Sequence, residues 1–121
     1  MLVILLTACS SGGSYKIIMG SLETADQEIT GSYHNFSGHY FQQISLEKGD
    51  ELTANLVSTT DKGRLKAELV DPEGNTLLQF TGESQAQHRK LKIPEKGVYK
   101  FKVIGDNHQG SFTLSWDLES K

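Results

Sequence analysis

The sequence predicts an all-β fold: an antiparallel β-sandwich of about eight strands, similar to a jelly roll. Apolar and polar residues alternate in several segments, and no long segment repeats its apolar residues with helical spacing. Groups of Gly, Pro, Asp and Asn separate these segments at intervals of about 8 to 12 residues. Strands with one apolar and one polar face are typical of antiparallel sheets that share a core.

Four segments show this alternation most clearly. The apolar positions are Leu52, Ala54 and Leu56 in the first segment, Leu65, Ala67 and Leu69 in the second, Tyr99, Phe101 and Val103 in the third, and Phe112, Leu114, Trp116 and Leu118 in the last. Polar residues such as Thr53, Glu68 and Lys100 lie between them. We therefore expect these apolar side chains, Trp116 included, to form the core.

The segments between these strands have the composition of turns. They are residues 47–50, 61–63, 71–75, 94–97 and 105–110. In the segment 71–75, Pro72 presets φ for a type I turn, and Gly74 supplies the left-handed residue that follows it.

One predicted strand, at residues 39–46, breaks the alternation. Tyr40 and Ile44 share a face, but Phe41 falls on the other. A β-bulge near Gln42 and Gln43 would turn Phe41 inward. Otherwise Phe41 is exposed or contacts a second surface.

Residues 39–118 resemble the bacterial pre-peptidase C-terminal domain and its jelly-roll relatives. The resemblance lies in a Tyr/Phe strand at 40–41, the turn Gly49-Asp50, the turn 71–74, the strand 97–103 and the closing strand 110–116. It implies a non-catalytic module. Relatives accompany secreted peptidases, and some bind collagen, polysaccharide or calcium.

Composition excludes several classes of function. The net charge of −3 argues against a basic surface that would bind the phosphates of nucleic acid. The one basic cluster, at 88–92, fits a solvent-exposed strand face. A single cysteine, Cys9, permits neither an intramolecular disulfide nor a cysteine-based zinc site. No stretch reaches the roughly 18 to 20 apolar residues of a membrane-spanning helix.

The segment Leu6-Thr7-Ala8-Cys9 resembles the bacterial lipobox. This resemblance implies a diacylglyceryl group on the Cys9 sulfur, cleavage just before Cys9, and attachment to the cell membrane at its extracytoplasmic face through acyl chains such as palmitate. Two buried acyl chains anchor a protein stably, whereas one is marginal. No Lys or Arg precedes the apolar run, so we expect the natural chain to begin further upstream or to have been trimmed.

The alternative is that residues 2–6 form a buried strand with Cys9 in the core. The Ser/Gly tract at 10–14 favours a tether instead. We therefore predict three parts: residues 1–8 as a remnant of a signal peptide, 9–26 as the lipidated cysteine with a flexible tether, and 27–121 as the β-sandwich.

Metal sites have weak support in the sequence. The histidines His34, His39, His88 and His108 lack zinc-site spacing, and we expect them at the surface. Calcium is the cation that the oxygens of Asp71, Glu73 and Asn75 would suit. The turn explains these three residues without it, so we predict no resident cofactor.

A cluster of aromatic residues is the best candidate for ligand binding. Tyr33, Phe36, Tyr40 and Phe41 lie within nine residues, interleaved with amide and imidazole side chains. If exposed, they would stack on sugar rings or anchor a protein partner. The alternative is that most of them belong to the core.

We therefore expect a lipid-anchored, extracytoplasmic binding or structural module of the bacterial cell envelope, without enzymatic activity. The sequence contains no GxSxG element or other nucleophile motif. Two alternatives stay open: a carbohydrate-binding module for cell-wall or host glycan, and an accessory subunit that docks an envelope protein complex.

Overall fold

Seven antiparallel strands form the protein in the computed structural model, which describes residues 11–25, 27–82 and 86–119. The strands are β1 (Ser11–Ile18), β2 (Ser21–Ala25), β3 (Glu28–Leu46), β4 (Glu51–Val70), β5 (Thr76–Gly82), β6 (Ala86–Lys92) and β7 (Gly97–Glu119). Their hydrogen-bonded order is β1-β3-β7-β4-β5, while β2 also pairs with β3 and β6 with β4. The described part of the chain contains no helix long and apolar enough to cross a membrane.

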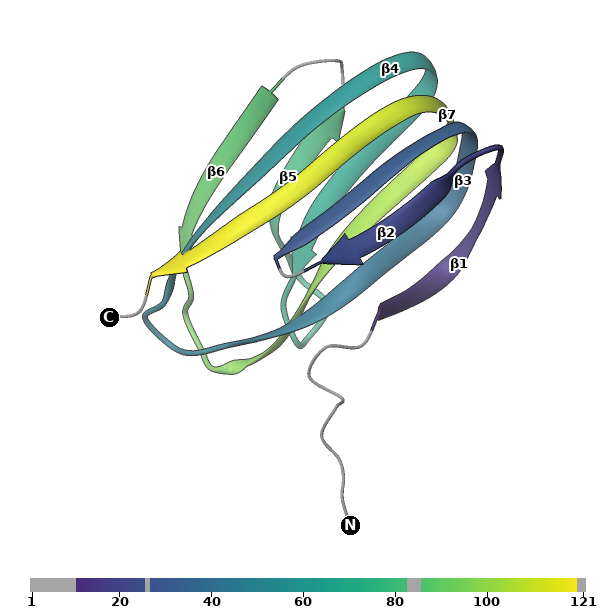
Figure 1. Cartoon of the computed structure of the whole chain (residues 1–121). Helices are drawn as coiled ribbons and strands as arrows, with labels where there is room; N and C mark the ends of the chain where they lie inside the picture. Colours follow the sequence, from purple (N-terminus) through teal and green to yellow (C-terminus); the bar gives the residue numbers. More distant parts are fainter. Residues whose placement is uncertain (1–10, 26, 83–85, 120–121) are drawn as a thin grey trace.

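The long strands β3, β4 and β7 each contribute to both layers of a sandwich. Figure 1 shows all three turning over at the same end of the molecule. Residues 28–33, 51–60 and 110–119 pair with one another and with β2 and β6, and we call this layer sheet I. Residues 38–46, 64–70 and 97–106 pair with one another and with β1 and β5, and we call this layer sheet II. The predicted β-sandwich is confirmed.

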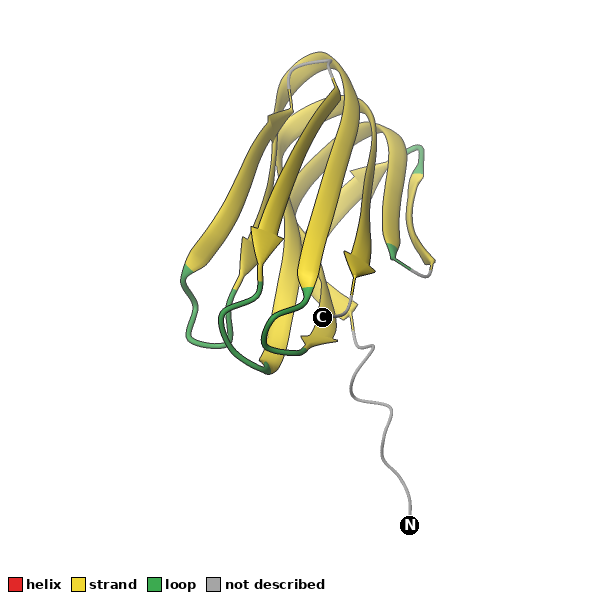
Figure 2. Cartoon of the chain, turned by 90° about the vertical axis from the view of Figure 1, so that its left-hand side faces the viewer, coloured by secondary structure: helices red, strands yellow, loops and turns green. Residues whose placement is uncertain are grey.

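Irregular backbone makes the bends between the two sheets. In β4 the register shifts between Thr60 and Arg64, where Gly63 adopts φ 78°. A Cβ at Gly63 would also collide with the backbone carbonyl of Asn107 in the neighbouring bend, so this position requires glycine. Figure 2 shows the longer loops at the opposite end of the sandwich.

The bulge expected near Gln42 and Gln43 is not found there. The pairing of β3 with β7 is regular from Gly38 to Leu46, and the register shifts instead between Tyr33 and Gly38. The irregularity lies upstream because that is where β3 bends from one sheet into the other. Phe41 therefore stays on the outer face of sheet II.

The core between the sheets consists of the side chains that alternate inward. Of the residues that alternation predicted as core, all but Leu118 are buried. Trp116 is 3% exposed and stacks on Phe101, with ring centroids 4.4 Å apart. Leu118 is 36% exposed because it lies near the end of β7, where the pairing with β3 has already ended at Ser115 and β4 is the strand that still pairs with it.

The tether predicted for residues 9–26 is wrong for residues 11–25, which form β1 and β2 along β3. The apolar residues of this segment explain the difference. Tyr15 contacts the rings of Phe36 and Tyr40 edge-on, and Ile17 and Leu22 pack against the core. Burial of these side chains offsets the backbone entropy that a Ser/Gly-rich segment loses on ordering. Cys9 and the predicted signal remnant lie outside the described residues.

Candidate functional site

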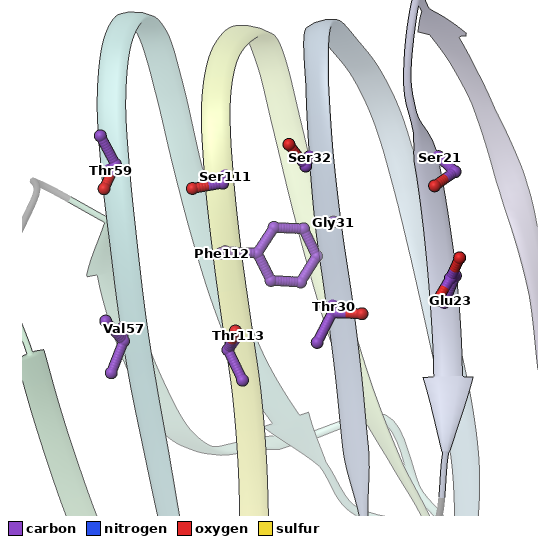
Figure 3. A pocket seen from close by; sticks show the side chains of 10 residues that line it. All are labelled: Ser21, Glu23, Thr30, Gly31, Ser32, Val57, Thr59, Ser111, Phe112 and Thr113. Atoms are coloured by element: carbon purple, nitrogen blue, oxygen red, sulfur yellow. The ribbon is translucent and has the colours of Figure 1, made fainter.

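A groove of about 410 Å³ lies on the outer face of sheet I, over strands β2, β3, β7 and β4. It is lined by Ser21, Glu23, Thr30, Gly31, Ser32, Val57, Thr59, Ser111, Phe112 and Thr113 (Figure 3). Most of these side chains point outward because the residues between them, such as Ile29 and Leu114, point into the core. We call this feature the hydroxyl groove.

Strand pairing arranges the lining side chains in two parallel rows across the sheet. Ser21, Ser32, Ser111 and Thr59 form one row, and Glu23, Thr30, Thr113 and Val57 form the next. Adjacent strands lie about 4.8 Å apart, so each row extends about 14 Å across the four strands. The first row therefore presents a hydroxyl on every strand, and the second presents Thr30 and Thr113 between Glu23 and Val57.

The chemistry of the groove is that of a hydrogen-bonding surface with one acidic side chain. Each Ser or Thr hydroxyl both donates and accepts hydrogen bonds. Glu23 is the one ionisable residue of the lining, and its exposed carboxylate accepts hydrogen bonds. Val57, which is 54% exposed, supplies an apolar contact beside the hydroxyls. The arrangement suits a ligand that carries many hydroxyl groups.

Beneath the groove, a glycine makes room for an aromatic ring of the core. Gly31 lies directly opposite Phe112 in the strand pairing, and a Cβ at Gly31 would stand 2.6 Å from Cε2 of Phe112. The Phe112 ring is 2% exposed, so it supports the floor from below.

The structure does not gather the four predicted ligand-binding aromatics on one exposed face. Tyr33, Phe36 and Tyr40 are at most 9% exposed and lie in the core. Phe41 lies apart from them on the outer face of sheet II, with the Lys100 ammonium 4.6 Å from its ring centroid. Tyr33 and Phe36 would point to opposite faces of a regular strand, but the register shift between them turns both inward.

His108 differs from the expectation that the histidines lie at the surface: it is 0% exposed. Its Nδ1 is 2.8 Å from Oη of Tyr33, and its Nε2 is 2.8 Å from Oγ1 of Thr60. Burial lowers the pKa of His108 below its ordinary value, and the charge of Asp61 opposes this shift. Burial also raises the pKa of the Tyr33 phenol. These bonds join the bends of β3, β4 and β7, and they hold the end of the sandwich together.

Of the side chains predicted to suit calcium, Asp71 uses both of its carboxylate oxygens within its own turn. Oδ1 of Asp71 accepts hydrogen bonds from the backbone amides of Glu73 and Asn75, at 2.9 and 2.8 Å. Oδ2 accepts a third from the Asn75 side chain. These bonds, led by the Asn75 amide, lower the pKa of Asp71. Within the described residues, no group of three or more His, Cys, Asp or Glu is placed to hold a metal.

Comparison with known proteins shows the fold. No protein-family model matches the chain. Human coronin-2A is 32% identical over 84 residues, which are 69% of this chain, and the chain spans only 15% of the length of coronin-2A.

Among solved structures, TmCBM61 in complex with β-1,4-galactotriose superposes with a TM-score of 0.52 at 13% identity, covering 95% of this chain and 90% of that one. A CBM4 structure gives a TM-score of 0.51 at 9% identity, covering 96% and 81%. The periplasmic inhibitor of g-type lysozyme from Aeromonas hydrophila gives 0.52 at 10% identity, covering 97% and 93%. The chain thus has the β-sandwich fold found in carbohydrate-binding modules, a fold that other kinds of protein share.

Sequence reasoning did not find the hydroxyl groove. Its signal is a repeat of Ser or Thr at alternate positions, in Thr30 and Ser32 of β3 and in Ser111 and Thr113 of β7. Alternate polar residues also mark any solvated strand face. Only the strand order places these two pairs side by side.

Proposed function

We propose that the chain is a non-enzymatic binding module of the bacterial cell envelope, and that it holds an oligosaccharide in the hydroxyl groove. The observation that carries the proposal is a set of six hydroxyls in two adjacent rows, four in one row across four strands and two in the next. The groove's volume falls within the range typical of small-molecule sites, about 300 to 1,000 Å³. The fold is one in which another protein, TmCBM61, holds β-1,4-galactotriose.

The groove's composition favours a neutral sugar. A sugar hydroxyl both donates and accepts hydrogen bonds, as the lining hydroxyls do. Each pair of hydroxyls can therefore form a hydrogen bond with either group as the donor. The Glu23 carboxylate accepts hydrogen bonds from sugar hydroxyls, but it repels the carboxylate of a uronic or sialic acid. Among the described lining residues no aromatic ring is exposed for stacking. Net hydrogen bonds contribute about 0.5 to 1.5 kcal/mol each, so we expect a Kd on the order of 1 mM.

Amide NMR titration of the full chain with neutral oligosaccharides, β-1,4-galactotriose among them, tests this site. We expect shifts confined to the groove strands, and a several-fold loss of affinity in Glu23→Gln and in Thr113→Val. Thr53→Val is the matched control, because Thr53 lies on the same face of sheet I outside the groove lining. Absence of groove shifts, or an equal loss in Thr53→Val, would reject the site.

The second part of the proposal is location: Cys9 carries a lipid that anchors the chain at the extracytoplasmic face of the cell membrane. Support comes from the lipobox-like residues 6–9 and from the resemblance of residues 39–118 to a module that accompanies secreted peptidases. Metabolic labelling with a fatty acid, in cells that express the chain with a complete signal peptide, should mark the wild type and not Cys9→Ser. Label in the Cys9→Ser chain would contradict the anchor.

A further inference from the structure

The two outer faces of the sandwich carry opposite charge. On sheet II the outward charged side chains are Lys16, Arg64, Lys66, Lys100 and Lys102, with Glu68 and Asp106. On sheet I they are Glu23, Glu28, Glu51, Asp117 and Glu119, with Lys90 and Lys92. A chain with a net charge of −3 therefore presents five basic and two acidic groups on one face, which we call the lysine face.

The centre of the lysine face combines free positive charge with an apolar ring. Lys102 lies directly opposite Phe41 in the strand pairing, and the Lys100 ammonium stands 4.6 Å from the centroid of the same ring. Within the described residues the one ion pair is Lys66–Glu68, at 3.3 Å. Glu68 lies opposite Lys102 in the strand pairing, but its carboxylate pairs with Lys66 instead. Among the described residues neither Lys100 nor Lys102 forms an ion pair, so their charges are available to an external anion.

The edge of the same sheet lies close to the proposed anchor. β1 is the edge strand of sheet II (Figure 1). It begins at Ser11, which pairs with Gln42. Two residues of extended chain span at most about 7 Å, so a lipid on Cys9 would hold this edge close to the membrane. At the other end of the edge strand, Ile18 is 45% exposed and the adjoining Met19 is 76% exposed.

We infer that the lysine face binds an anionic lipid surface and turns the hydroxyl groove away from the membrane. The orientation rests on the proposed anchor, whereas the charge separation between the faces does not. A basic surface gains roughly 1 kcal/mol per Lys or Arg close to an anionic membrane. Phe41 adds an apolar ring of the kind that enters bilayer interfaces, and Ile18 and Met19 supply an apolar rim. In the reverse orientation, the acidic face of sheet I would meet the same anionic headgroups.

Sedimentation of the full, unacylated Cys9→Ser chain with lipid vesicles tests the surface itself. We expect binding to vesicles of phosphatidylcholine with phosphatidylglycerol, no binding to phosphatidylcholine alone, and release by salt. In this Cys9→Ser background, the double substitution Lys100→Glu and Lys102→Glu should lower the apparent affinity for the anionic vesicles about tenfold or more. The matched control is the pair Lys90→Glu and Lys92→Glu, which makes the same charge change on sheet I and should bind as the parent does.

Three outcomes would overturn the inference: no binding to the anionic vesicles at low salt, equal loss in both charge-reversed pairs, or binding to the soluble polyanion dextran sulfate without binding to vesicles. Oligosaccharide titration of the same variants separates this result from the proposed function. A chain that keeps its groove shifts but ignores vesicles rejects the lysine face alone. Absence of fatty-acid label on the wild-type chain, or label that persists in Cys9→Ser, rejects the anchor alone.

Discussion

Replacement of Trp116 by alanine tests whether the core side chains of β7 stabilise the fold. Trp116 is 3% exposed and stacks on Phe101 at 4.4 Å with the ring planes 23° apart. Removing a buried tryptophan costs about 3 to 5 kcal/mol, and part of this is the ring contact, worth about 0.5 to 1.5 kcal/mol. A chain of 121 residues is stable by roughly 6 to 18 kcal/mol, so a loss near 4 kcal/mol is a large share of the total.

Urea unfolding followed by far-ultraviolet circular dichroism measures this loss. Tryptophan fluorescence cannot follow the alanine variant, because Trp116 is the one tryptophan of the chain. The milder variant Trp116→Phe keeps an aromatic ring against Phe101, and we expect it to lower the free energy of unfolding by about 1 to 2 kcal/mol. It provides the measurement if the alanine variant does not fold. A loss below about 1 kcal/mol in Trp116→Ala, with an unchanged m-value, would mean that the ring faces solvent and that the core assignment is wrong.

Two further predictions concern the floor of the groove and the bends. Gly31→Ala should cost about 1 to 3 kcal/mol, because the new Cβ would lie 2.6 Å from Cε2 of Phe112; an unchanged melting temperature would refute this packing. Burial lowers the pKa of His108, so the unfolded chain binds a proton there more readily than the folded chain. Stability should therefore be highest above the ordinary histidine pKa of about 6.5 and fall as the pH drops below it. The slope should be shallower in His108→Gln, and equal slopes in urea unfolding would exclude His108 as the cause.

The alternation of apolar and polar residues predicts the core well because it is a local property of each strand. Ala54, Phe101 and Leu114 are all buried, as expected from their spacing alone. Each predicted turn also separates two oppositely directed strands or marks a bend. Leu118 shows where the pattern stops being informative: it continues the alternation of β7, but the neighbouring strand β3 no longer pairs with β7 at that point.

The positions near the bends could not be predicted, because there the period of two is broken. Tyr33 and Phe36 are an odd number of residues apart, and only the register shift places both in the core. The burial of His108 depends on Tyr33 and Thr60, which are 75 and 48 residues away in sequence. No window of local sequence contains that network.

The fold-over of the long strands also separates the two proposed binding surfaces. β7 presents Lys100 and Lys102 outward in its first half, on sheet II, and Ser111 and Thr113 outward in its second half, on sheet I. One strand thus carries part of the lysine face and part of the hydroxyl groove, on opposite sides of a core about 10 Å thick. Side chains so far apart, with no shared partner, contribute additively to binding and stability. Because the two surfaces face opposite directions, a membrane covering one leaves the other open to a glycan.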